Sequence, residues 1–357
     1  MGSKRHMQYV PALDGVRAVA VFLVMLSHVG VPGFTGGGMG VDVFFVLSGF
    51  LITTLLLEEM DAKGRINVLH FYARRLLRLY PALLLMLLLF ALFFHILRHV
   101  LPHAEQLESA KDIMLAALYL TDYAIAFDFQ SKNSLIAHTW SLAVEEHFYL
   151  IWPWLLPLLS RACKGKKLIM ALLGMFVAAT AWKFFCLSVQ PWEKVYFRFD
   201  TRMAGLILGA LLAVCKAQKI KIPGADYALA LSGIAFFYVI ATMPSMEVGT
   251  AQTTFAEVFS FFLINKITDA RAWRPAQILA HKIPVFLGRI SYALYLFHFP
   301  VAALFLRSET RWWIGFEVTL AVALALAWFS WKTVERVGRL KAKAFRPSGA
   351  GRHVAGD

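Results

Sequence analysis

The chain has 357 residues, 59% of them hydrophobic, and a formal net charge of +14. Soluble domains are closer to half apolar, and the excess here forms runs of the roughly 20 residues that a helix needs to cross a bilayer. The basic residues cluster between these runs, as in cytoplasmic loops, which argues against a nucleic-acid-binding protein and for an all-α, polytopic transmembrane helical bundle.

The apolar runs predict about ten membrane-spanning helices. In chain order they cover residues 16–31, 40–57, 80–97, 138–160, 168–188, 199–215, 226–243, 249–265, 285–306 and 313–332. Lys and Arg gather in alternate loops and in the C-terminal tail, whereas the loops 32–39 and 244–248 have neither. Because Lys and Arg are enriched on the cytoplasmic side of membrane proteins, both termini are expected in the cytoplasm.

Two segments do not fit this alternation. Residues 111–127 are apolar but short, and a span there would place the basic loop 161–167 outside. A re-entrant or interfacial helix on the outer side is therefore expected. Residues 66–79 carry arginines that share one helical side, among them Arg75 and Arg78. This segment is expected to be a helix at the cytoplasmic interface, where its arginines either bind lipid head groups or serve a function.

Polar residues within the first span are candidates for function, because a charge in hydrocarbon costs at least about 2.5 kcal/mol. Arg17 and His28 lie eleven positions apart. This spacing is three helical turns plus about 20°, so both side chains are expected to face the same way, about 16 Å apart along the axis. Arg17 would lie at the cytoplasmic end and His28 in the outer half.

The second span carries Asp42 near its outer end. In the middle of this span, Ser48 and Gly49 are small residues that permit close contact with another helix. The glycine-rich loop 33–40 before the span offers backbone N–H groups that could bind an oxyanion, but a flexible connector is the preferred interpretation.

The fourth span places Ser141, Glu145 and Tyr149 on one face, because they are spaced by four, whereas Glu146 is expected to point elsewhere. Glu145 would reach the depth of His28. A carboxylate that accepts one imidazole N–H fixes the tautomer and raises the basicity of the other nitrogen. The pair is therefore either a general-base arrangement or a buried ion pair that ties two helices together.

The remaining histidines are given structural interpretations. His95, His99 and His103 recur every four residues, as a metal-binding face would, but a solvated helix end is preferred and no metal site is expected. His138 opens the fourth span near His28. His298 is expected to serve core packing.

Four stretches resemble, in order, the motifs of the acyltransferase-3 family of integral membrane O-acyltransferases, which includes O-antigen and exopolysaccharide acetylases. They are LDGVRAVAVFLVMLSH with Arg17 and His28, VDVFFVLSGFLIT, RRLLRLYP with Arg75 and Arg78, and HTWSLAVEEHFYLIWP with Ser141, Glu145 and Tyr149. Weaker matches are DTRMAGLILGALLA, RISYALYLFHFPV and TVER. The match covers nearly all of an expected membrane domain at 9–340, followed by a basic cytoplasmic tail at 341–357. No appended hydrolase-like domain is expected.

The resemblance implies a multi-pass acyltransferase of a bacterial cytoplasmic (inner) membrane. Its donor would be an acyl-CoA, usually acetyl-CoA, and its acceptor a hydroxyl of a carbohydrate, glycolipid or macrolide at the outer side. Arg17, Arg75 and Arg78 lie near the cytoplasmic face, where guanidinium groups could hold the CoA phosphates. The pantetheine arm is long enough to carry the thioester towards His28.

At the outer end, His28 would act either as a general base on the acceptor hydroxyl or as an acyl carrier. Glu145 would orient it. The expected substrate contacts are Asp42, Ser141 and Tyr149. A transporter or flippase is the alternative, because intramembrane Arg, His and Glu also build substrate pathways. The two halves of the sequence show no inverted repeat of the kind that many transporters have.

Overall fold

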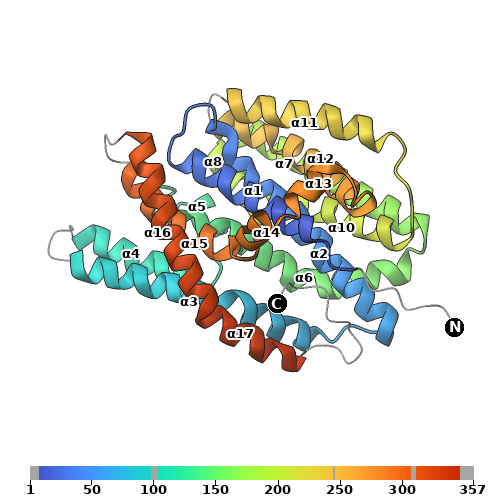
Figure 1. Cartoon of the computed structure of the whole chain (residues 1–357), viewed down its shortest axis with the longest axis horizontal. Coiled ribbons are helices and arrows are strands. Elements are labelled where there is room, and N and C mark those ends of the chain that lie inside the picture. Colours follow the sequence, from blue (N-terminus) through green and yellow to red (C-terminus); the bar gives the residue numbers. More distant parts are fainter. Residues whose placement is uncertain (1–7, 98–102, 244–245, 307–310, 346–357) are drawn as a thin grey trace.

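The computed structural model describes residues 8–97, 103–243, 246–306 and 311–345, and within these ranges every regular element is a helix (Figure 1). The elements are α1 (Pro11–His28), η1 (Thr35–Met39), α2 (Gly40–Lys63), α3 (Val68–Leu97), α4 (His103–Ala117), α5 (Thr121–Ala126), η2 (Ala137–Thr139), α6 (Trp140–Ala162), α7 (Lys166–Val189), α8 (Trp192–Tyr196), α9 (Phe199–Arg202), α10 (Ala204–Ala217), α11 (Ala225–Thr242), α12 (Met246–Asp269), α13 (Arg274–Leu279), α14 (Lys282–Arg289), α15 (Ser291–Leu306), α16 (Trp312–Lys332), α17 (Val334–Ala342) and η3 (Lys343–Phe345).

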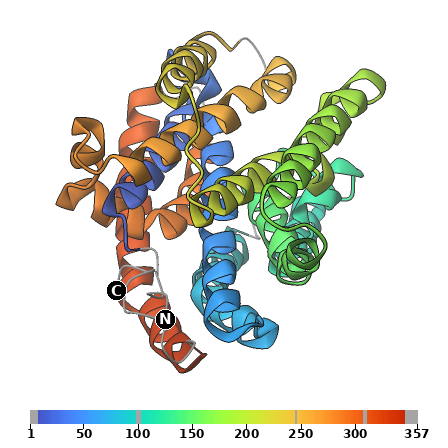
Figure 2. The ribbon, with the colours of Figure 1, turned by 90° about the vertical axis from the view of Figure 1, so that its right-hand side faces the viewer.

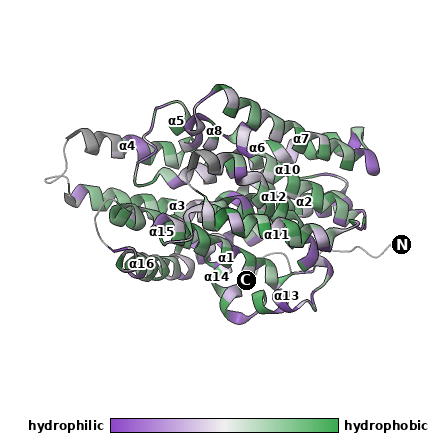
Figure 3. Cartoon of the chain, turned by 90° about the horizontal axis from the view of Figure 1, so that it is seen from above, coloured by the Kyte–Doolittle hydropathy of each residue, from purple (hydrophilic) through white to green (hydrophobic). Residues whose placement is uncertain are grey.

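The predicted polytopic membrane bundle is confirmed. Six helical segments of the described chain are long and apolar enough to cross a membrane, namely α1, η1 with α2, α3, α7, α11 and α16 with its C-terminal extension. The pair α14 and α15, bent by 68°, passes the same test as one broken span. The other predicted spans fall on α6, α10 and α12, which do not meet it. Apolar colouring runs along most of the helices (Figure 3).

The expected interfacial helix at 66–79 is not a separate element. α3 runs unbroken from Val68 to Leu97, with Pro81 inside it, and so joins that segment to the predicted span 80–97. A proline is tolerated in a membrane helix because neighbouring groups satisfy the backbone that it leaves free. As a result, Arg75 and Arg78 lie in the N-terminal half of one long helix, α3.

The segment 111–127 forms the end of α4 and all of α5, and the two helices are separated by a turn at Tyr119, whose φ is 54°. Neither helix is among the candidate spans. α5 packs against α6 and α8. The expectation that this segment does not cross the membrane stays a prediction, and the segment consists of two short helices rather than one.

Glycines allow α2 and α10 to make a close helix–helix contact. A Cβ atom on Gly49 would lie 1.9 Å from the carbonyl oxygen of Leu206, and one on Gly209 would lie 2.1 Å from that of Val46. Close backbone approach through small residues is a common way to pack helices in lipid. The predicted role of Gly49 is confirmed, and the contact fixes the position of α2 in the bundle.

The glycine-rich loop expected to be a flexible connector is instead packed. Its η1 helix lies against α1 and α11, and a Cβ atom on Gly37 would come within 2.2 Å of the carbonyl oxygen of Leu23. The hydroxyl of Thr35 donates to the carbonyl oxygen of Met243 (3.0 Å). Glycine permits this backbone-to-backbone approach because it has no side chain.

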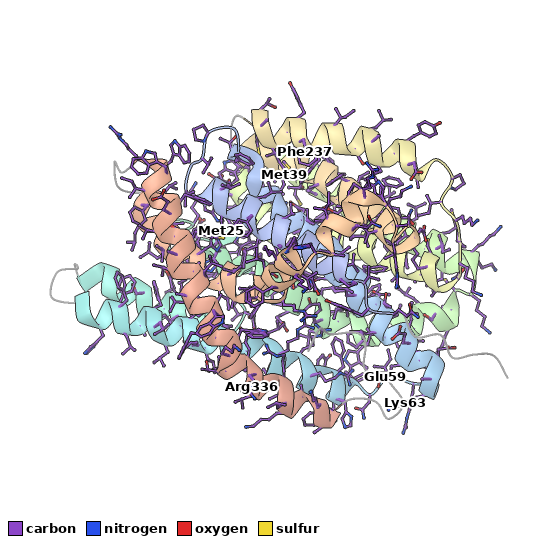
Figure 4. The ribbon with its side chains drawn as sticks, viewed as in Figure 1. Met25, Met39, Glu59, Lys63, Phe237 and Arg336 are labelled. Carbon is purple, nitrogen blue, oxygen red and sulfur yellow. The ribbon has the colours of Figure 1, made fainter. Side chains whose placement is uncertain are left out.

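One end of the bundle gathers the basic side chains of Lys63, Arg74 and Arg336. Figure 2 shows the end of α2, the start of α3 and α17 together at one end, and in Figure 4 Glu59, Lys63 and Arg336 are labelled there, away from Met25 and Met39. Within this end, Arg74 pairs with Glu59 (3.2 Å) and donates to the carbonyl oxygen of Phe345 (2.8 Å). The basic end is the one that the charge pattern assigns to the cytoplasm.

Candidate active site

Arginines from α1 and α3 meet towards the basic end of the bundle. Arg17 pairs with Asp14 (2.6 Å), which also accepts a hydrogen bond from Tyr9 (2.5 Å). Arg75 and Arg78 make neither an ion pair nor a hydrogen bond with any residue in the described ranges. The guanidinium of Arg75 lies over the ring of Tyr149, 5.4 Å from its centroid.

These guanidinium groups keep accessible surface. Arg75 and Arg17 are half-buried, and Arg78 is exposed, even though it lies on a helix of the bundle. Arg78 is close enough to both Arg75 and Arg17 for their charges to interact. Repelling cations with unsatisfied donors are an arrangement that favours an anionic ligand, to which a guanidinium can donate paired hydrogen bonds.

Glu145 lies in this arginine layer and not beside His28. It accepts a hydrogen bond from Tyr149 (2.8 Å), and its charge interacts with those of Arg17 and Arg75. The shared face of Glu145 and Tyr149 was predicted correctly from their spacing. The predicted contact with His28 is not made in the described structure, because tertiary packing and not depth along α6 decides where the carboxylate lies.

Glu146 also belongs to the site, although it was expected to point elsewhere. It is half-buried, and its charge interacts with Arg75 and with the hydroxyl groups of Tyr119 and Tyr292. These partners come from α3, from the turn between α4 and α5, and from α15. The neighbouring His147 instead lies 3.0 Å from Asp122 on α5.

His28, at the end of α1, meets α15. Its Nδ1 lies 2.9 Å from Nε2 of His298, and the two rings are nearly parallel (14°) with their centroids 5.2 Å apart. Nδ1 of His298 in turn lies 2.6 Å from the carbonyl oxygen of Tyr295. His298, expected to serve core packing, is fully buried and is also the hydrogen-bonding partner of His28.

A polar network surrounds these two imidazoles. His138, predicted to lie near His28, is buried beside His298, and its Nε2 lies 3.1 Å from the carbonyl oxygen of Leu296. The hydroxyl of Ser141 lies 2.6 Å from that of Tyr295 and donates to the carbonyl oxygen of His138 (3.2 Å). Ser141 is therefore engaged within the protein, between α6 and α15.

One side of α15 connects the arginine layer with His28. Tyr292, Tyr295 and His298 are spaced by three, so they follow one another along a helical face. Tyr292 interacts with Tyr119 and Glu146, Tyr295 with Ser141, and His298 with His28. The late sequence motif RISYALYLFHFPV carried these residues, but no rule of spacing linked them to residues on other helices.

Asp42 lies in a separate, closed centre. It forms an ion pair with Arg202 (2.8 Å), and both side chains are 1% exposed. The guanidinium of Arg202 also lies over the rings of Tyr196 (4.7 Å) and Trp140 (5.4 Å). The side chain expected to meet an acceptor is thus paired within the protein. Sequence reasoning missed this partner because the two residues are 160 positions apart.

A second pair of charges lies close to the first. Lys183 on α7 donates to the hydroxyls of Thr253 (2.9 Å) and Thr254 (2.6 Å) on α12, and its charge interacts with those of Glu257 and Asp42. Two cations therefore face two carboxylates between α2, α7, α9 and α12. Within the described part of the chain no cluster of three or more His, Cys, Asp or Glu residues is arranged to hold a metal ion.

Comparisons with known proteins agree with the sequence motifs. An O-acetyltransferase of Staphylococcus aureus strain COL, named provisionally, is 30% identical over 370 aligned residues, which cover 96% of this chain and 60% of that protein. The O-acetyltransferase OatA of S. aureus strain NCTC 8325 is 30% identical over 322 residues, 82% of this chain and 51% of OatA. No solved structure shows a significant match. The acyltransferase-3 family model, described as an acyltransferase domain, matches residues 10–332, and the chain belongs to this family.

Proposed function

We propose that this chain is a membrane O-acetyltransferase. It takes an acetyl group from acetyl-CoA bound at the basic, cytoplasmic end and transfers it to a hydroxyl of a carbohydrate or related acceptor at the opposite end. The observation that carries the proposal is the arrangement along α1: Arg17 beside the unpaired Arg75 and Arg78 at one end, and His28 at the other. The relatives named as O-acetyltransferases support the acetyl group and the hydroxyl acceptor, although the chain spans only about 60% of the length of the first of them.

The proposed CoA site is supported by a difference between neighbouring arginines of α3. Arg74 is occupied by Glu59 and a backbone carbonyl, whereas Arg75 and Arg78 have donors to spare in the described structure. These two, together with Arg17, hold the CoA phosphates. The pantetheine arm then runs beside α1, whose rise from Arg17 to His28 is about 16 Å.

The proposed acetyl transfer uses the ring nitrogen of His28 that makes no hydrogen bond to His298. Nδ1 is bonded to His298, so Nε2 is the reactive atom. As a general base it removes the proton of the acceptor hydroxyl, whose oxygen attacks the thioester carbonyl; the C–S bond breaks and CoA leaves as the thiol after taking up the proton. As a nucleophile, Nε2 first takes the acetyl group from the thioester and then passes it to the acceptor oxygen. Both routes need the same nitrogen.

Glu145 acts at the donor end in this proposal. Its carboxylate holds the hydroxyl of Tyr149, whose ring in turn supports the guanidinium of Arg75. Glu145 therefore positions the arginine layer. The assignment of Asp42, Ser141 and Tyr149 to substrate contacts stays a prediction; the hydroxyl of Tyr149 is hydrogen-bonded to Glu145 and Ser48 within the protein.

The location follows from the same charge asymmetry. The chain is a multi-pass membrane protein, and the Lys- and Arg-rich end that holds Lys63 and Arg336 is the end expected in the cytoplasm. We place it in a bacterial inner membrane with both termini on the cytoplasmic side. CoA would then reach Arg75 and Arg78 directly from the cytoplasm.

The test compares surface glycans and glycolipids from the host organism, with the gene deleted and complemented by wild type, His28→Gln or Arg74→Gln. Mass spectrometry should show acetyl groups lost on deletion, restored by wild type and Arg74→Gln, and absent with His28→Gln, because a positioned base or nucleophile supplies on the order of 100-fold to 10,000-fold. Acetylation that persists with His28→Gln, at equal protein level in the membrane, would overturn the mechanism. An unchanged glycan and glycolipid profile on deletion would overturn the acceptor class.

A further inference from the structure

We propose that His298 is a positioning residue that fixes the tautomer of His28, so that Nδ1 of His28 carries the proton and Nε2 presents its lone pair to the substrate. The inference rests on the proposed role of His28 in acetyl transfer. It assigns to a second histidine the function that the sequence had suggested for Glu145.

Two hydrogen bonds link the carbonyl oxygen of Tyr295, His298 and His28. Their directions follow from the carbonyl oxygen, which can only accept. The backbone carbonyl oxygen of Tyr295 has no proton to give, so Nδ1 of His298, 2.6 Å away, must donate. A neutral imidazole has a single N–H, and Nε2 of His298 is therefore the unprotonated nitrogen. It accepts from Nδ1 of His28 at 2.9 Å, which leaves Nε2 of His28 without a proton.

The surroundings keep His298 neutral and fixed in place. Its side chain is fully buried between the rings of His138, Tyr295 and Phe299. No carboxylate of the described chain pairs with it, and an unpaired buried charge is costly. The neighbouring titratable group, His138, also gives its Nε2–H to a backbone carbonyl, that of Leu296. Both bonds run to carbonyls of α15, so the helix itself sets the orientation of these rings.

The arrangement has the logic of a catalytic triad in which a buried acceptor orients the imidazole base. Here the acceptor is a neutral imidazole backed by a carbonyl. It orients His28 without a carboxylate paired to either imidazole in the described structure. A free histidine side chain prefers the opposite tautomer, with the proton on Nε2, so the loss of His298 should place a proton on the atom that has to react.

The direct test is nitrogen NMR of the full chain, labelled with ¹⁵N-histidine, in lipid bilayers. The signals of His28 are identified by their loss in His28→Gln. In wild type we expect a protonated Nδ1 and an unprotonated Nε2. His298→Gln places an amide oxygen near the position of Nε2 and should keep this pattern, whereas His298→Leu should shift the proton of His28 to Nε2. His138→Gln is the matched control and should leave the His28 signals unchanged.

Acetyl transfer in the complemented host then separates this inference from the proposed function. We expect the rate to fall by about 100-fold in His298→Leu, the lower end of the contribution of a positioned base, and to be largely restored in His298→Gln at equal protein level. If His28 keeps its proton on Nδ1 in His298→Leu, the inference is wrong, whatever the activity. If the tautomer changes as expected but His28→Gln still transfers acetyl groups, the proposed role of His28 fails while the structural assignment stands.

Discussion

Arg75 and Arg202 are both guanidinium groups inside the same helical bundle, but their surroundings are opposite. Arg202 is 1% exposed, paired with Asp42 at 2.8 Å and enclosed by aromatic rings. Arg75 is half-buried, forms no direct ion pair with the described residues although the charges of Glu145 and Glu146 reach it, and shares its surroundings with the cation of Arg78. A buried charge with a direct ion partner ties helices together, whereas an accessible one without such a partner is available to a ligand.

The comparison is useful because the sequence patterns around the two arginines are similar. Each is a charge in or next to an apolar run, and each lies in a stretch that resembles a family motif. Burial and a direct ion partner distinguish Arg202 from Arg75. The following experiments exploit that difference, from the largest expected effect to the smallest.

The largest effect is expected from breaking the buried ion pair between Arg202 and Asp42. Arg202→Met leaves the carboxylate of Asp42 buried without its partner, which should destabilise the fold by about 3–5 kcal/mol. Thermal unfolding in lipid nanodiscs, followed by tryptophan fluorescence, measures this loss. The double variant Asp42→Leu with Arg202→Met should recover most of the stability, since a packed apolar pair can replace a buried ion pair. A single variant as stable as wild type would contradict the structural role.

Removing the open arginines should affect binding and spare the fold. Arg75→Gln with Arg78→Gln is expected to weaken CoA affinity by about 100-fold, because each hydrogen bond from a charged donor contributes roughly 1.5–3 kcal/mol. Calorimetry with CoA and purified protein in nanodiscs measures the change, with Tm expected to stay near that of wild type.

Arg74→Gln is the matched control for these two variants. It removes an adjacent arginine that is already satisfied by Glu59, so CoA affinity should change little. Equal loss of affinity in Arg74→Gln would mean that the general charge of this end, and not the open pair, binds the phosphates.

A smaller loss of stability is expected from the helix contact that holds Asp42 in place. A methyl group on Gly49 would lie 1.9 Å from the carbonyl oxygen of Leu206, so Gly49→Ala should force α2 and α10 apart at a cost of about 1–3 kcal/mol. Gly174 on α7, whose added Cβ would meet nothing within 4 Å, is the control. If Gly49→Ala and Gly174→Ala have the same Tm, the contact between α2 and α10 is looser than described.

The smallest effect concerns a charge pair outside the spans. Lys132 donates to Glu193 (2.8 Å) and lowers the pKa of that carboxyl below its usual value. The stabilisation is therefore present at neutral pH, above the pKa of Glu193 in the unfolded chain, and is lost as the pH falls through the lowered pKa of the folded state.

Because this pair is accessible to solvent, Lys132→Ala should cost less than about 0.5 kcal/mol. Unfolding measured at neutral pH and at pH below the Glu193 pKa should show the difference between variant and wild type disappear in acid. A loss as large as that of Arg202→Met would remove the distinction between exposed and enclosed pairs.

The fold class and much of the site were accessible from the sequence. Each predicted span falls on helical segments, although 199–215 is divided between α9 and α10 and 285–306 between α14 and α15. Glu145 and Tyr149 share a face as their spacing requires. Predictions from local patterns were wrong at two places that helix packing decides. Residues 66–79 continue into α3, and the glycine-rich loop packs against α1 and α11. The expected pairing of Glu145 with His28 failed for the same reason, since equal depth in a bilayer does not mean contact.

By itself, the sequence determined that this is a membrane protein of many helices, which residues carry charge within it, and which end is basic. These properties are local, because they depend on the length of apolar runs and on the loops between them. Only the tertiary structure decided which polar groups meet. His28 and His298 are 270 positions apart, and Asp42 and Arg202 are 160 positions apart. Helix packing determines which of such distant residues meet, and the periodicity within one helix contains no information about it.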